Sequence, residues 1–106
     1  MSDRELLEAA SKAAGMSDRL VWWELAGCFQ VLGDTPAKLW NPLTDDGDAL
    51  RLAVKLKLDL TFYSQGIHVM ALDAQPYADD AMAATRRAIV RSAAEIGRAE
   101  DGRGGT

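Results

Sequence analysis

The single histidine and the single cysteine limit the chemistry that this chain can do alone. His68 and Cys28 are the only residues of their types among 106, so one chain can form neither a disulfide nor a metal site of several Cys and His ligands. The sequence also lacks a G-x-S-x-G motif, a Rossmann fingerprint and a glycine-rich phosphate loop after a strand. We therefore expect no catalytic residues, no metal and no cofactor, with His68 in a structural role.

Three acidic residues, Asp45, Asp46 and Asp48, gather where a helix is expected to begin. Clustered carboxylates can bind a hard cation, but the run lacks the spacing of an EF-hand loop. Acids in a first turn also stabilise a helix through its dipole, and Thr44 or Asp45 is a suitable N-cap. We favour this second interpretation. The same acids make the helix end a poor site for anions.

Trp40 and Asn41 stand directly before this acidic helix start, and Pro42 keeps Asn41 out of helical geometry. An indole beside an amide would suit stacking on a base and hydrogen bonding to its edge. The alternative is that Trp40 fills the edge of the core before the helix. The sequence leaves both interpretations open.

The last predicted helix places one arginine inside its apolar sector. At about 100° per residue, Arg86 lies only about 60° from Ile89, whereas Arg87 lies on the solvated face. A charge at the edge of the core needs a partner, because an unpaired buried charge is costly. The candidate partners for Arg86 are an internal acid such as Asp59 or Asp73, a ligand phosphate, and an acidic group of another subunit.

Helical and extended patterns alternate along the chain and must position these residues. Helices are expected over residues 2–14, from residue 44 to about 56, and over 78–98, and strands over 20–25, 28–32, 58–63 and 67–72. The order α-ββ-α-ββ-α predicts an α/β protein of the α+β type, with one four-stranded antiparallel sheet layered with helices.

Residues 1–99 are expected to form one domain, and the glycine-rich residues 100–106 a flexible tail. Trp22 and Trp23 should point to opposite faces of a strand. In the second helix, Leu50 and Val54 are expected on or beside a well-buried apolar face.

The acidic balance, a net charge of −4, argues against binding to nucleic acid. The N-terminus has no apolar stretch of the kind found in signal peptides, and no run is long enough for a membrane span. These features predict a cytoplasmic protein.

Two stretches carry a resemblance to a known family. Residues 40–56, WNPLTDDGDALRLAVKL, and residues 83–97, AATRRAIVRSAAEIG, resemble the phage ABA sandwich domain of small phage and prophage proteins, and with residues 6–15, LLEAASKAAG, the likeness covers most of the chain. The resemblance implies layered α/β architecture and a phage accessory protein in the host cytosol. It implies no shared activity. An anti-defence role follows only by analogy with other small phage proteins.

Two functions fit this sequence. The first is non-enzymatic binding and sequestration, by a homo-oligomer, of a small nucleotide-derived signal of host immunity. Its candidate ligand-binding residues are Arg86, Arg87, Trp40 and Asn41, with Asp45 or Asp48 accepting a hydrogen bond from a ribose hydroxyl. The alternative is a protein–protein interaction module that inhibits a host protein. A pocket where Arg86 and Trp40 converge would favour the first, and a flat exposed apolar patch the second.

Overall fold

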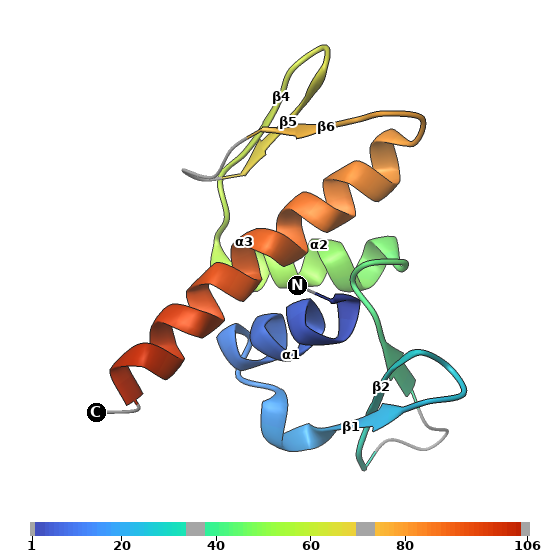
Figure 1. The fold of residues 1–106 in the computed structure, drawn as a ribbon, viewed down its shortest axis with the longest axis vertical. Coiled ribbons are helices and arrows are strands. Elements are labelled where there is room, and N and C mark those ends of the chain that lie inside the picture. Colours follow the sequence, from blue (N-terminus) through green and yellow to red (C-terminus); the bar gives the residue numbers. More distant parts are fainter. Residues whose placement is uncertain (1, 34–37, 70–73, 105–106) are drawn as a thin grey trace.

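Three helices and two small antiparallel sheets make up the chain in the computed structural model, which describes residues 2–33, 38–69 and 74–104. The elements in chain order are α1 (Asp3–Ala13), the 3-10 turn η1 (Ser17–Arg19), β1 (Leu20–Trp23), β2 (Cys28–Val31), β3 (Lys38–Trp40), α2 (Asp46–Leu56), β4 (Leu60–Phe62), β5 (Gly66–Val69), β6 (Gln75–Pro76) and α3 (Ala81–Gly104). The helices lie between the sheets, which occupy opposite ends of the molecule (Figure 1). The mixed α/β class predicted from the sequence is confirmed.

The main core forms where α1 packs along the second half of α3. Helix α1 begins with a capping box in which the Ser2 side chain accepts from the N–H of Glu5 and the Glu5 side chain accepts from the N–H of Ser2. Small side chains line the contact, and Ala10 and Ala93 are completely buried. Gly97 lies against the Ala9 carbonyl so closely that a Cβ there would overlap it. Small residues therefore allow the two helix backbones to approach each other closely.

Helix α2 joins this core by a narrower face than the sequence suggested. Asp45 is the N-cap, and its side chain accepts from the N–H of Asp48. The buried residues are Ala49, Leu52 and Ala53. Leu50 and Val54 are exposed, so the expectation of a well-buried helix is wrong for these two positions. The helix packs on one side only, and its other side faces solvent.

The first sheet has the order β1-β2-β3 and is antiparallel throughout. Its inward face contributes Leu20, Phe29 and Trp40 to the main core. Trp22 packs edge-on against Phe29, with ring centroids 5.1 Å apart, whereas Trp23 is exposed. The two tryptophans thus point to opposite faces, as predicted.

The second sheet has the order β4-β5-β6 and covers the first half of α3. Ile67 and Val69 of β5 pack on Ala88 of α3 and form a second, smaller apolar cluster. His68 is half-buried, and its ring meets that of Tyr63 edge-on at 5.6 Å. Residues 70–72, which were predicted to continue this strand, lie outside the described residues.

The prediction of one four-stranded sheet is wrong, because the two hairpins belong to separate sheets. Each hairpin pairs with a third short strand, β3 or β6. Helix α3 has 24 residues and spans about 36 Å at 1.5 Å per residue. It is therefore long enough to offer a separate packing surface to each sheet.

The last helix extends further than expected, with its backbone continuing to Gly104. Residues 105 and 106 lie outside the described residues, and a flexible tail over 100–106 stays a prediction. Within the described ranges, no helix combines the length and the apolar character that crossing a membrane requires.

A methyl group at the α1–α3 contact should destabilise the protein. Because the Ala9 carbonyl leaves no room for a Cβ, we expect Gly97→Ala to lower the free energy of unfolding by about 1–3 kcal/mol, although alanine is the better helix former. Gly47→Ala is the matched control. It meets only flexible side-chain ends in α2 and should be neutral or stabilising by up to about 1 kcal/mol. Urea denaturation of both variants measures the difference, and equal stabilities would contradict the packing argument.

Candidate functional site

Arg86 of α3 donates hydrogen bonds to the turn between β3 and α2 and to α2 itself. It does not line the groove between the first sheet and α2. Its Nε donates to the carbonyl oxygen of Leu43 at 2.9 Å, and its Nη1 donates to Oδ1 of Asp46 at 2.6 Å. The Arg86 side chain is 16% exposed and that of Asp46 is 60% exposed. The expectation that Arg86 sits at the core edge with a specific partner is confirmed. The acid is Asp46 rather than Asp59, and Asp73 lies outside the described residues.

A groove of about 920 Å³ runs between the first sheet and the N-terminal turn of α2. It contains four of the six residues that the sequence predicted for a ligand: Trp40, Asn41, Asp45 and Asp48. The other lining residues come from residues 16–32, from β3, and from the start of α2 with the turn before it, among them Met16, Arg19, Cys28, Val31, Lys38, Leu39, Thr44 and Arg51. Arg86 and Arg87 do not line this groove, and ligand binding by the other four residues stays a prediction.

Trp40 is buried in the core edge and contributes its surface as a floor. Its side chain is 6% exposed, and its ring lies 6.5 Å from that of Phe29. Of the two interpretations of Trp40 that the sequence left open, core packing is the one that this geometry supports. With so little of its surface exposed, the indole offers a ligand in the groove little area for stacking.

Asn41 and Asp48 use most of their hydrogen-bonding capacity in building the groove wall. The Asn41 backbone N–H donates to Oδ2 of Asp48 at 3.0 Å, and Asn41 Oδ1 accepts from the N–H of Leu43 at 3.1 Å. Asp48 Oδ1 accepts from Nη2 of Arg51 at 2.7 Å. These bonds fix the turn between β3 and α2 and leave Asp48 few sites for a ligand.

Asp45 and Arg51 form the exposed lip of the groove. Asp45 Oδ2 accepts from the N–H of Asp48 at 2.8 Å and lies 3.8 Å from Nη2 of Arg51. Both side chains are more than half exposed, so the pair is solvated and contributes little to stability. One oxygen of Asp45 and the other nitrogens of Arg51 remain available at the lip.

Two further cations, Arg19 and Lys38, line the groove, and the sequence did not identify them as candidate site residues. Arg19 ends the η1 turn and Lys38 begins β3, and both side chains are exposed. No carboxylate in the described part of the chain forms an ion pair with either of them. Nothing in the sequence signalled the pair, because Arg19 and Lys38 are far apart along the chain and β2 brings them together.

Cys28 lies in the groove wall as a neutral thiol. Burial raises the pKa of Cys28, and the nearby negative charge of Asp48 raises it further. Such a thiol is a poor nucleophile at neutral pH, because the reactive species is the thiolate. Cys28 therefore serves as a small apolar packing residue here.

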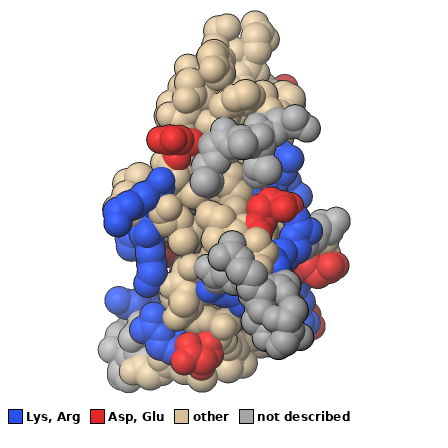
Figure 2. Space-filling view, turned by 90° about the vertical axis from the view of Figure 1, so that its left-hand side faces the viewer, with Lys and Arg blue, Asp and Glu red and all other residues tan. Residues whose placement is uncertain are grey.

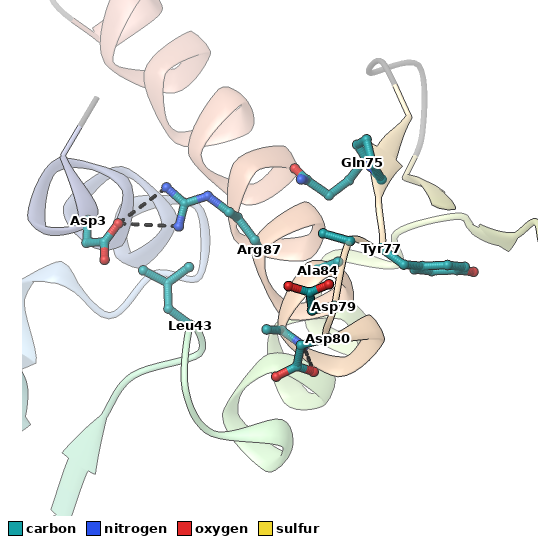
Figure 3. A pocket seen from close by; sticks show the side chains of 11 residues that line it. Asp3, Leu43, Gln75, Tyr77, Asp79, Asp80, Ala84 and Arg87 are labelled. Carbon is teal, nitrogen blue, oxygen red and sulfur yellow. Dashed lines mark hydrogen bonds and ion pairs between the residues drawn. The ribbon is translucent and has the colours of Figure 1, made fainter. Parts of the chain in front are cut away.

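A second hollow of about 420 Å³ lies at the start of α3 and contains Arg87. Figure 3 shows Arg87 reaching from α3 to Asp3 of α1, where its Nη2 lies 3.4 Å from Oδ1. Asp79 and Asp80 line the same hollow, and Asp80 accepts from the N–H of Ala83 at the helix start. The three acids outnumber the one cation, so this hollow is unsuited to an anionic ligand.

No protein-family model matches the chain, and no curated protein or solved structure is significantly similar to it. The resemblance of residues 40–56 and 83–97 to the phage ABA sandwich domain stays a prediction. In the ranges that the structure describes, no three residues among His, Cys, Asp and Glu are grouped so as to hold a metal ion.

Removal of the Arg86 contacts should cost stability, which distinguishes Arg86 from Arg87. We expect Arg86→Ala to lower the free energy of unfolding by about 1.5–3 kcal/mol, because it leaves the Leu43 carbonyl without its charged donor. The loss stays below the roughly 3–5 kcal/mol of a fully buried pair, since Asp46 is left mostly in water. Arg87→Ala breaks an exposed pair and should cost at most about 1 kcal/mol.

Arg86→Lys should recover little of this stability, because one ammonium cannot copy the forked contact to Leu43 and Asp46. Thermal melts of the three variants measure the order. Equal melting temperatures for Arg86→Ala and Arg87→Ala would show that the contacts of Arg86 with Leu43 and Asp46 stabilise the fold no more than the exposed pair of Arg87 does.

Proposed function

We propose that this protein binds a small nucleotide-like anion in the groove between the first sheet and α2, and holds it without transforming it. The observation that carries the proposal is the pair of cations, Arg19 and Lys38, on a groove of about 920 Å³, with no ion-pair partner among the described residues. A groove of this volume matches the pockets that hold small ligands. A site rimmed by unpaired cations favours a negatively charged ligand.

The groove offers different chemistry along its length, which favours a ligand with distinct parts. Arg19 and Lys38 would hold the phosphate or another anionic group, while Thr44 and the free oxygen of Asp45 would bind hydroxyl groups of a sugar. Met16 and Leu39 supply apolar surface for a flat ring. This assignment keeps Asp45 in its predicted role and transfers the anion-binding role from Arg86 and Arg87 to Arg19 and Lys38.

Binding without catalysis fits the side chains of the groove. Its one thiol, Cys28, is held neutral. One oxygen of Asp45 caps α2, and Asp48 accepts from Asn41 and Arg51. A protein that only holds a nucleotide-derived signal lowers the free concentration of that signal. Sequestration of an immune messenger, a role taken by analogy from other small phage proteins, requires no more than this.

Removal of the groove cations should weaken ligand binding while leaving the fold intact. With ADP-ribose and cyclic di-AMP as probes in isothermal titration calorimetry, we expect Arg19→Ala and Lys38→Ala each to raise Kd by about tenfold or more, the loss of one charged hydrogen bond. Lys55→Ala is the matched control, since Lys55 is exposed on α2 away from the groove and should leave Kd unchanged.

Native mass spectrometry of protein purified from cells with an active signalling defence tests the same proposal with an unknown ligand. A co-purified small molecule that is present with wild type and Lys55→Ala, and absent with Arg19→Ala and Lys38→Ala, supports it. No bound molecule and no binding of either probe would contradict it.

An interaction module that inhibits a host protein is the second candidate, favoured by the outward face of the first sheet. Val21 and Trp23 are 47% and 42% exposed there, and Leu25 in the β1–β2 turn is 91% exposed. Leu39, 47% exposed, belongs to the same face and also borders the groove. Val21 and Leu39 lie in one cross-strand row on either side of Gln30. This uncharged surface is of the kind found at protein interfaces.

The two candidate functions respond to different substitutions. Val21→Lys places a charge on the outward face and should leave binding in the groove unchanged. If inhibition of host defence depends on the groove, Arg19→Ala abolishes it and Val21→Lys retains it in a phage plaque assay. The reverse pattern identifies the sheet face, and therefore a protein partner, as the functional surface.

A further inference from the structure

We propose that a second copy of this chain pairs with the outer edge of β4, so that the two small sheets at the ends of two molecules join into one six-stranded sheet. The inference does not depend on the proposed function, because neither Arg19 nor Lys38 lies on this sheet. Strand β4 is the edge of the order β4-β5-β6, and no described element pairs with its other side.

The hydrogen-bond alternation of the hairpin identifies which groups are free. The N–H of Tyr63 donates to the carbonyl oxygen of Gly66 at 2.9 Å. The backbone N–H and C=O groups of Tyr63 and, two residues earlier, of Thr61 therefore point toward β5. Antiparallel pairing alternates along a strand. Leu60 and Phe62 therefore point their N–H and C=O groups away from β5, into the space beside the sheet.

These free groups fit a two-fold axis through Thr61. An antiparallel copy centred there pairs Leu60 with Phe62 of the partner subunit, and Phe62 with Leu60 of the partner subunit, through four backbone hydrogen bonds. Thr61 would then lie in a non-hydrogen-bonded pair with its own copy, about 4.5 Å away between Cα atoms. The pairing would also give Phe62, now 62% exposed, a leucine neighbour on the same face.

Charge does not oppose this contact. Residues 60–69 include no Asp, Glu, Lys or Arg, and the tip of the hairpin appears uncharged at the top of Figure 2. The nearest acid, Asp59, would face Tyr63 of the partner subunit. The two Asp59 residues would be four positions apart along the strands, roughly 14 Å, which exceeds the screening length of about 8 Å in physiological salt.

Two of the other three sheet edges carry features that prevent such pairing, whereas the third, β1, has neither lysine nor proline and is the alternative that the Val21 variant tests. Strand β6 contains Pro76 and is two residues long. Strand β3 begins with Lys38, and Asp48 accepts from the N–H of Asn41 just after it. Natural proteins protect edges with lysine, proline, short strands and covering elements. Strand β4 is also short, but it contains neither lysine nor proline, and it stands at one end of the long axis of the molecule (Figure 1).

The shortness of the paired strands limits the expected affinity of the dimer. Three residues on each side bury less than the roughly 1,200 Å² of a standard stable interface, so we expect a reversible dimer with Kd in the micromolar range. The test is sedimentation velocity of the full chain from about 5 to about 500 μM, since self-association depends on concentration.

Thr61→Lys and Thr61→Glu each place two like charges face to face at the axis, which is unfavourable between directly opposed strand residues. We expect the wild type to move from monomer toward dimer across this range. Each variant alone should show a Kd raised by at least about tenfold, and an equimolar mixture of the two should dimerise again. That rescue cannot come from misfolded chains. Phe62→Pro, which removes an outward-facing N–H together with the phenyl ring, should also be monomeric.

Val21→Lys is the matched control, because it puts the same charge on an exposed strand position of the first sheet. It should dimerise as the wild type does. A wild type that stays monomeric at every concentration overturns the proposal. So do Thr61 variants that dimerise normally or whose mixture fails to associate. Loss of the dimer in Val21→Lys alone would assign self-association to the first sheet instead.

Discussion

The forked contact of Arg86 is the interaction on which the candidate site depends. Its guanidinium joins the first half of α3 to the Leu43 carbonyl and to Asp46 at the start of α2, and thereby fixes the turn that connects β3 to α2. That turn carries Asn41 and Asp45, and Asp48 follows in the first turn of α2; all three residues line the groove. Arg86 acts as a positioning residue, because it determines where the wall stands without touching the groove. A cation near the apolar sector of a helix thus stabilises a site on another element.

Most polar groups of the groove wall are already bonded to one another. Asp48 accepts from Asn41 and Arg51, Asp45 caps its helix, and Trp40 is packed in the core edge. A rigid wall of this kind favours binding, because little side-chain entropy remains to be lost when a ligand enters. The binding chemistry then falls to the groups that the fold leaves unpaired on the facing side, Arg19 and Lys38.

The sequence predicted structural features that depend on residues close together in the chain. It did not predict features that depend on contacts between residues far apart in the chain. The capping box of Ser2 and the Asp45 cap were predictable because they span three residues, and the opposite directions of Trp22 and Trp23 follow from strand geometry. Division into two sheets was not predictable, because alternation specifies a strand but not its partner. Leu50 and Val54 are exposed because α2 packs on one side only, which the periodicity of its sequence does not reveal. Lys38 and Arg19 became neighbours only through the pairing of β1, β2 and β3.

The two apolar clusters on α3 differ greatly in size, and this has a consequence for how the molecule opens. The main cluster joins both other helices and the first sheet, whereas the second rests on Ile67, Val69 and Ala88 with a few half-buried neighbours. Regions with few buried contacts separate from the native structure at lower free energy than the rest. Although Leu60 of β4 also packs against the main cluster, we expect the hairpin of β4 and β5 to open at lower free energy than the contact of α1 with α3. Amide hydrogens of β5 should then exchange before those of α1. Any contact that holds this hairpin against α3 thus stabilises the part of the fold with the fewest buried apolar contacts.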